Sequence, residues 1–123
     1  MNVTLSQINP IVGNFSYNKD LIINCYKNSL DSSDLIVFPE MAICGYPPQD
    51  LLLDKSFLKM NQKVLQSIAE ISSKPIIIGL ARKEGNSIYN SAALCANGSI
   101  IKFYDKINLP TYDVFDEKRY FTK

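Results

Sequence analysis

The chemistry open to this sequence is limited by what it lacks, because its 123 residues include no histidine. Ser-His-Asp and Cys-His arrangements and histidine-bound metals are therefore excluded within these residues. Acid–base chemistry must use carboxylates, lysine, tyrosine or thiols. Glu40 is the carboxylate singled out by its position, since it follows the apolar run Leu35–Phe38 and Pro39. Proline cannot donate to a sheet ladder, so Glu40 is predicted just past the carboxyl end of a buried strand, where open α/β sheets place ligands.

The neighbours of Glu40 predict that it has a partner. The apolar pattern resumes at Met41–Cys44, so the carboxylate is flanked on both sides by chain that favours burial. A carboxylate held there needs a group of opposite charge, which we expect elsewhere in the chain. Gly45, Pro47 and Pro48 fix the turn that follows. The alternative is that Glu40 is a solvated loop residue.

Composition narrows the class of protein. The sequence is 46% hydrophobic and 20% charged, as in an ordinary globular protein, and its length allows one domain at most. Thirteen Lys and Arg residues against twelve Asp and Glu residues give no electrostatic case for nucleic acid or an acidic membrane. No leader pattern and no stretch of about 20 apolar residues is present, so we expect no membrane partner and a cytoplasmic location.

The three cysteines, Cys25, Cys44 and Cys95, predict neither a disulfide framework nor a zinc site. They are odd in number, widely spaced and set in apolar surroundings, which favours reduced, buried thiols. The sequence contains no Cys-x-x-Cys motif, so we expect no bound metal.

Hydrophobic periodicity predicts an α/β fold in the order β-α-β-α-β-β-β, with a mixed sheet covered by helices on at least one face. The predicted strands are Val3–Ile8, Leu35–Phe38, Ile76–Leu80, Ile88–Cys95 and Ile100–Asp105, and the predicted helices are Asn18–Leu30 and a segment from Asp54 or Ser56 to about Ser72. Adjacent predicted strands near the end are joined by turns, one of them the hairpin-favouring pair Asn97-Gly98. Gly79 is expected to mark a bend or close packing.

The last segment, Asn108–Lys123, shows neither a helical nor a strand period and is predicted to be an ordered loop. Its final apolar residues, Tyr120 and Phe121, have no obvious cover. We therefore expect the chain to be the front portion of a longer protein, or to pair with other chains.

Two groups of motifs resemble the nitrilase superfamily of carbon–nitrogen hydrolases. The first is F-P-E-M-A-I-C-G-Y at Phe38–Tyr46, and the second is Y-D-K-I-N-L-P-T-Y-D-V-F-D-E at Tyr104–Glu117. Further motifs at Gly45–Leu53, Tyr89–Ala92 (Y-N-S-A) and Leu109–Phe121 are similar to the glutaminase domain of the glutamine-dependent NAD+ synthetases. The resemblance covers nearly the whole chain. It implies a partial αββα sandwich, with residues 1–123 as the N-terminal part of the hydrolase domain.

The resemblance also implies roles for four residues. The superfamily uses a Glu-Lys-Cys triad, which places the general base at Glu40 and the lysine at Lys106. Lys106 follows the predicted strand Ile100–Asp105 as Glu40 follows Leu35–Phe38, so two strand ends can bring the charges together. Glu117 resembles a second glutamate that orients the lysine, and Tyr112 a substrate-binding tyrosine near bound glutamine. The alternatives are a solvated Lys106, a solvated charge run at Glu117 and simple packing of Tyr112.

The sequence departs from the family at the nucleophile, which the resemblance places after residue 123 and which matches none of the three cysteines. Cys44, although near Glu40, is interpreted as a small buried residue. By resemblance the function is hydrolysis of glutamine to supply ammonia for ATP-dependent amidation of deamido-NAD, with ATP and Mg²⁺ in a synthetase domain outside these residues. We expect residues 1–123 alone to be inactive and the protein to form a homo-oligomer. The alternatives are a stand-alone amidase or carbamoylase, and a non-catalytic module in which Glu40 and Lys106 form a structural ion pair.

Overall fold

The computed structural model describes residues 1–113 and 115–123. The elements follow the order β1 (Val3–Leu5), α1 (Phe15–Ser29), β2 (Leu35–Val37), η1 (Gln49–Leu53), α2 (Lys55–Ile71), β3 (Ile76–Glu84), β4 (Ser87–Ala96), β5 (Ser99–Asp105) and η2 (Glu117–Arg119), where η1 and η2 are 3₁₀ helices. This order confirms the predicted β-α-β-α-β-β-β arrangement and the α/β class.

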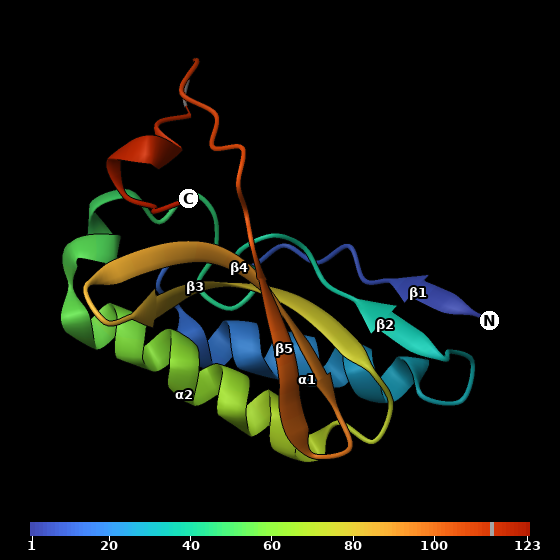
Figure 1. The fold of residues 1–123 in the computed structure, drawn as a ribbon. Coiled ribbons are helices and arrows are strands. Elements are labelled where there is room, and N and C mark those ends of the chain that lie inside the picture. Colours follow the sequence, from blue (N-terminus) through green and yellow to red (C-terminus); the bar gives the residue numbers. More distant parts are fainter. Residues whose placement is uncertain (114) are drawn as a thin grey trace.

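The strands form one five-stranded mixed sheet in the order β1-β2-β3-β4-β5. Strands β1, β2 and β3 run parallel, and β3, β4 and β5 form an antiparallel meander. Both α-helices lie against the same face of this sheet (Figure 1). The molecule therefore has one helix layer and one sheet layer, which is half of an αββα sandwich.

The main core lies between the helices and this face of the sheet. Ile22 and Tyr26 of α1 and Leu65 of α2 are fully or almost fully buried there, packed against Ile36 of β2 and Ile78 of β3. Successive strand residues point to opposite faces, so the neighbours of these core residues project away from the helices.

The face opposite the helices is largely uncovered by the described residues. Leu5 of β1 is 76% exposed and Tyr104 of β5 is 67% exposed. Among the described residues, the C-terminal segment covers one end of this face, and its Thr122 N–H donates to the Ile88 carbonyl at 2.7 Å. Leu109 and Phe121 of this segment are buried in a second hydrophobic cluster. The aromatic Phe121, for which the sequence offered no cover, thus packs within the chain.

Several boundaries differ from the predicted ones for local reasons. Helix α1 begins at Phe15 because the Asn14 side chain accepts from the Tyr17 N–H, a capping bond that apolar spacing does not reveal.

Strand β1 ends at Leu5 because β2, its partner, ends at Val37 before Pro39. Strand β3 continues past Leu80 to Glu84 because β4 pairs with it along its whole length. Of the two predicted starts of α2, Asp54 is the capping residue, since its carboxylate accepts from the Ser56 N–H at 2.8 Å.

Gly79 lets the turn after β2 rest directly on β3. A Cβ atom on Gly79 would lie 2.5 Å from both the Met41 nitrogen and the Pro39 oxygen, and 2.7 Å from the Glu40 Cα. The Gly79 N–H donates to the Pro39 carbonyl at 3.2 Å, and the Gly79 carbonyl accepts from the Ile43 N–H at 3.3 Å. The expected close packing at Gly79 is thus present, and it fixes the height of Glu40 above the sheet.

No helix within residues 1–113 and 115–123 combines the length and apolar character needed to cross a membrane. The three cysteines are free: Cys44 and Cys95 are buried, whereas Cys25 is only partly covered. The expectation of unpaired thiols is therefore confirmed, and burial holds for two of the three.

Candidate active site

Three charged side chains meet beside the uncovered face of the sheet. Lys106 Nζ lies 2.9 Å from Glu40 Oε1 and 3.1 Å from Glu117 Oε1. Glu40 follows β2, Lys106 follows β5 and Glu117 opens η2. The partner that Glu40 was expected to need is thus Lys106, and the two strand ends bring the charges together. We refer to Glu40, Lys106 and Glu117 as the charged triad.

Burial differs sharply across the charged triad. The side chain of Glu117 is 5% exposed, that of Lys106 33% and that of Glu40 44%. Glu117 is therefore not part of a solvated charge run, because η2 turns it inward while its neighbours Lys118 and Arg119 stay exposed. Glu40 is more exposed than the apolar residues around it suggest, since it lies beside the face of the sheet that the described residues leave open.

The two carboxylates determine the charge state of Lys106. Burial alone lowers the pKa of the lysine, but the hydrogen bonds and charges of Glu40 and Glu117 outweigh that effect and raise the pKa above its ordinary value. Lys106 is thus a fixed cation at neutral pH. A fixed ammonium group can stabilise negative charge that develops on a substrate oxygen.

Asn90 is a member of the site that the sequence reasoning missed. Its side-chain amide donates to Glu40 Oε1 at 2.5 Å, and its backbone carbonyl accepts from the Lys106 N–H at 2.8 Å. The residue is 4% exposed. A single asparagine in a strand pattern reads as an ordinary position, and the only signal for it was its place in the Y-N-S-A motif at Tyr89–Ala92.

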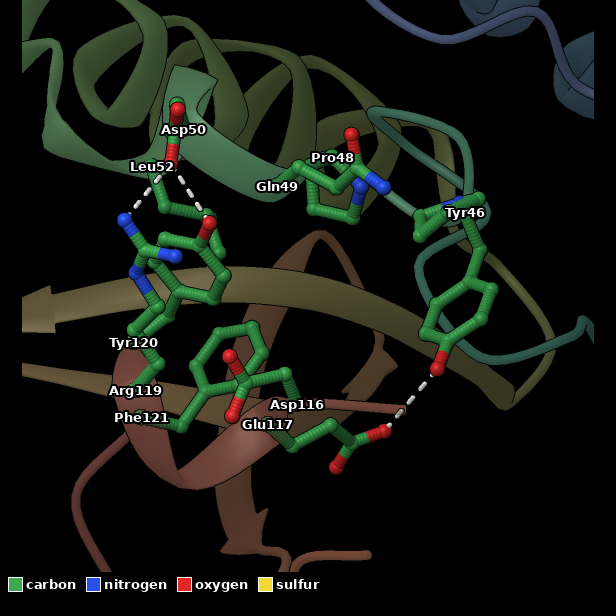
Figure 2. Close-up of a pocket in the computed structure, with 11 residues that line it drawn as sticks. Tyr46, Pro48, Gln49, Asp50, Leu52, Asp116, Glu117, Arg119, Tyr120 and Phe121 are labelled. Atoms are coloured by element: carbon green, nitrogen blue, oxygen red, sulfur yellow. Dashed lines mark hydrogen bonds and ion pairs between the residues drawn. The ribbon is translucent and has the colours of Figure 1, made fainter. Parts of the chain in front are cut away.

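Tyr46 was also missed, because it lies in a turn rich in glycine and proline. Its hydroxyl donates to Glu117 Oε1 at 3.2 Å, as Figure 2 shows. Burial, together with the charge and hydrogen bond of Glu117 and the charge of Glu40, raises the pKa of Tyr46 to about 12. The phenol therefore keeps its proton at neutral pH. Glu117 Oε1 is consequently held from two sides, by Lys106 and by Tyr46.

Cavities flank the charged triad. One of about 220 Å³ is lined by Glu40, Lys106 and Asn90, with the small residues Gly79 and Ala92 among its walls. A second, of about 300 Å³, lies between the turn that carries Tyr46 and the segment that carries Glu117 (Figure 2). The first is the better candidate for a substrate pocket, since both Glu40 and Lys106 border it.

Tyr112 lies at the rim of the site and not in the core. It is 66% exposed, and its ring packs edge to face against Phe115 with 5.6 Å between ring centroids. Together with Lys106 it borders an open cavity of about 430 Å³. A substrate contact from Tyr112 stays a prediction, and the residue is accessible enough to make one.

The two buried cysteines, Cys44 and Cys95, are not arranged as nucleophiles. The Cys44 thiol lies 3.7 Å from the Met41 sulfur and 3.5 Å from the Gly45 carbonyl oxygen, and burial raises its pKa to about 12. Burial likewise raises the pKa of Cys95 to about 11. Neither residue provides a thiolate near neutral pH, and the thiolate is the attacking form. Cys44 is therefore a small buried residue, as interpreted from the sequence.

Within the described ranges, no three His, Cys, Asp or Glu side chains gather closely enough to hold a metal ion. What the site does assemble is a carboxylate that can accept a proton, a cation that can stabilise an oxyanion, and neutral donors that orient both carboxylates.

Residues 2–123 match the sequence profile of the carbon-nitrogen hydrolase family. The chain belongs to this family. Among sequence relatives, it is 42% identical over 125 residues to the glutamine-dependent NAD(+) synthetase of Thermotoga maritima, and 38% identical over 122 residues to that of Acinetobacter baylyi. The alignments cover 98% of this chain in both cases, but 22% and 23% of the relatives. The chain thus spans less than a quarter of the length of these relatives.

Solved structures agree with the family assignment. The glutamine-dependent NAD+ synthetase of Acinetobacter baumannii superposes with a TM-score of 0.92 at 37% identity, over 99% of this chain and 24% of that chain. An amidase from Nesterenkonia sp. superposes with a TM-score of 0.83 at 23% identity, over 99% of this chain and 47% of that chain. At that identity the amidase shows a shared fold and no more. The expected nitrilase-type fold is confirmed.

Proposed function

We propose that residues 1–123 supply the general base and the oxyanion-stabilising lysine for hydrolysis of the glutamine side-chain amide, as the N-terminal part of a glutamine-dependent NAD+ synthetase. The observation that carries the proposal is the charged triad, in which Lys106 Nζ contacts both Glu40 and Glu117 beside an open cavity. The NAD+ synthetase relatives, at 38% to 42% identity over nearly the whole chain, support glutamine as the substrate.

In the proposed reaction a cysteine thiol attacks the amide carbon of glutamine while Glu40 takes the thiol proton. The carbonyl oxygen gains negative charge, which Lys106 stabilises. Glu40 then delivers the proton to the departing ammonia, and the resulting thioester is hydrolysed by water to glutamate. Glu117 holds Lys106 in place, and Asn90 holds Glu40.

The attacking thiol is proposed to come from chain outside residues 1–123. The burial and raised pKa values of Cys44 and Cys95 support this, as does the small share of the relatives that the chain covers. The ammonia would serve ATP-dependent amidation of deamido-NAD in a synthetase domain, where ATP and Mg²⁺ are expected. Assembly into a homo-oligomer is part of the same proposal.

The test is replacement of Glu40 by Gln in the full-length protein. Glu40→Gln keeps the shape of the side chain and its contact with Asn90 but removes the base. We expect glutamine-dependent NAD+ synthesis to fall by at least about 100-fold, while synthesis from added ammonium salts is retained. Equal loss of both activities would contradict the assigned role of Glu40.

A matched control is Glu70→Gln, which removes an exposed carboxylate on α2 that lies outside the charged triad. This variant should retain both activities. A parent protein that hydrolyses simple amides but synthesises no NAD+ would overturn the synthetase part of the proposal and favour an amidase.

A further inference from the structure

A second charged network lies on the sheet face opposite the charged triad. Arg82 of β3 forms ion pairs with Glu84 and, at 2.7 Å, with Asp105 Oδ2, and its Nε donates to Ser91 Oγ at 3.3 Å. The Ser91 hydroxyl lies 2.5 Å from Asp105 Oδ1, to which it donates. Arg82, Ser91 and Asp105 thus close a ring of hydrogen bonds. Arg82 is only 8% exposed.

The pairing register places this network on the helix side of the sheet. Ser91 pairs directly with Leu80 on β3 and with Asp105 on β5, and directly paired residues project from the same face. Leu80 belongs to the core beneath the helices, so Ser91 and Asp105 point the same way. Asn90, one position away, points to the other face, where it contacts Glu40.

Two aromatic rings hold the Arg82 guanidinium from its sides. Its central carbon lies 4.8 Å from the ring centroid of Tyr89 and 4.8 Å from that of Phe103. Tyr89 belongs to β4 and Phe103 to β5, so one side chain of β3 ties together all three strands of the meander. The planar guanidinium suits this place because it can stack and form several directed hydrogen bonds at once.

The network contacts β5 at the last residue of the strand. Asp105 ends the strand and Lys106 follows it, so Asp105 is held from the helix side while Lys106 reaches to the opposite face. The backbone hydrogen bonding to β4 continues one residue past Asp105, since the Lys106 N–H donates to the Asn90 carbonyl. Neighbouring residues in β4 and at the end of β5 therefore project to opposite faces of the sheet. Ser91 and Asp105 face the helices, and Asn90 and Lys106 face the charged triad.

We propose that Arg82, Ser91 and Asp105 form a positioning clamp that fixes the end of β5 and so holds Lys106 against Glu40 and Glu117. Its effect on catalysis rests on the proposed function, whereas its effect on the place of Lys106 does not. A misplacement of about 1 Å in a catalytic group can cost on the order of 100-fold in rate, so a clamp behind the sheet would matter to the chemistry in front of it.

The experiment measures the chemical reactivity of Lys106 in the full-length protein. Wild-type protein, Arg82→Gln and Asp105→Asn are labelled with acetic anhydride over a range of pH, and the acetylation of each lysine is read by mass spectrometry. Lys102→Gln is the control. Lys102 also lies on β5, and in the described part of the chain it forms no ion pair. Lys74, hydrogen-bonded to the Leu30 and Ser33 carbonyls, is the internal reference.

We expect Lys106 to be protected in the wild type and in Lys102→Gln, and to label several-fold faster in both clamp variants, with its titration shifted toward that of an ordinary lysine. Lys74 should be unchanged throughout. In the same variants kcat for glutamine hydrolysis should fall about 10- to 100-fold.

Unchanged labelling of Lys106 in a folded clamp variant would overturn the proposal. So would an equal rise at Lys74, because that would indicate general loosening. If Arg82→Gln does not fold, the labelling of Asp105→Asn tests the proposal alone. That variant is the milder one, since the asparagine oxygen can still accept from the Ser91 hydroxyl. If Lys106 responds as expected but the wild type hydrolyses no glutamine, the clamp stands and the proposed function fails.

Discussion

At the scale of single residues, the least anticipated contribution is that of Asn90. Its side chain and its backbone reach two different members of the charged triad, because the amide donates to Glu40 while the carbonyl accepts from Lys106. A base that must accept and then return a proton has to keep one orientation through both steps. The Asn90 amide, buried and fixed in the middle of a strand, provides that orientation without adding charge.

Replacement of Asn90 by Ala should therefore impair catalysis more than folding. Under the proposed function, glutamine-dependent NAD+ synthesis by the full-length protein should fall about 10- to 100-fold, because Glu40 loses its fixed donor, while ammonium-dependent synthesis is retained. The measurement compares kcat for the two nitrogen sources. Asn86→Ala is the control, since Asn86 is exposed in the β3–β4 turn. A variant with unaltered glutamine-dependent kcat would contradict the assigned role of Asn90.

At the scale of elements, the contact between β3 and the turn after β2 sets the place of Glu40. Gly79 has no Cβ, and the turn occupies the space where one would be. Any larger residue would push against backbone atoms on both sides of Glu40, and backbone cannot give way as a flexible side chain can. One glycine in a strand thus sets where the Glu40 backbone lies relative to Lys106.

We predict that Gly79→Ala lowers both stability and activity. Overpacking of this kind costs about 1–3 kcal/mol, and the displaced turn should reduce glutamine-dependent turnover by more than about tenfold. Urea unfolding and steady-state kinetics of the full-length protein check the two effects.

Gly85→Ala is the matched control for Gly79→Ala. Gly85 lies at φ +58°, and no atom lies within 4 Å of the position that a Cβ would take, so an alanine there meets backbone strain and no clash. It should cost about 1 kcal/mol and leave turnover unchanged. Equal kinetic losses in the two variants would show that the Gly79 contact is not specific to the site.

The elements also show what sequence patterns could and could not reveal. Apolar runs placed the strands, and the end of one run placed Glu40, because hydrophobic periodicity and strand ends are local properties. Lys106 was singled out by the family resemblance. The roles of Asn90 and Tyr46 depend on which distant segments come to lie beside them, so local pattern does not reveal them. Glu117 lies in a charge run that resembles a solvated surface, and only the turn of η2 buries it.

At the scale of the whole molecule, the described residues bring Glu40 and Lys106 together, while the buried thiols Cys44 and Cys95 keep their protons near neutral pH. We therefore predict that residues 1–123, produced alone, hydrolyse no measurable glutamine, because removal of the nucleophile alone abolishes most of such catalysis. An assay of glutamate release, with the full-length protein as the positive control, checks this. Turnover that survives Cys44→Ala, Cys25→Ala and Cys95→Ala would show that the proposed chemistry is wrong.

Alkaline pH should destabilise the fold through its buried thiol. The unfolded chain loses the Cys44 proton near the ordinary pKa of 9.0, whereas burial delays that loss to about 12 in the folded state. The folded state then binds more protons between these values, so the free energy of unfolding falls as pH rises through that window.

Lys106 acts in the same direction at higher pH. Its contribution to stability is full below its ordinary pKa of 10.5 and is lost as pH rises through its raised pKa.

Urea unfolding of residues 1–123 at about pH 8 and about pH 11 measures this loss. Cys44→Ala should start from a lower stability, because it leaves a small cavity, but should lose less between the two pH values. Asn86→Ala, at an exposed position without a titratable group, should lose as much as the wild type. A Cys44→Ala variant with the wild-type pH slope would contradict the assignment.

The order of strands in the sheet has a consequence for how the protein reaches its native state. Strands β3, β4 and β5 are neighbours in sequence joined by tight turns, so their pairing closes short loops and should form early during folding. Strands β1 and β2 join through helical crossovers, which require contacts of long sequence separation. Asn90 on β4 and Lys106 after β5 should thus take their native positions early in folding. The Glu40 carboxylate, which follows β2, should join them in a later step. Hydrogen exchange during refolding should accordingly protect the amides of β4 and β5 before those of β1 and β2.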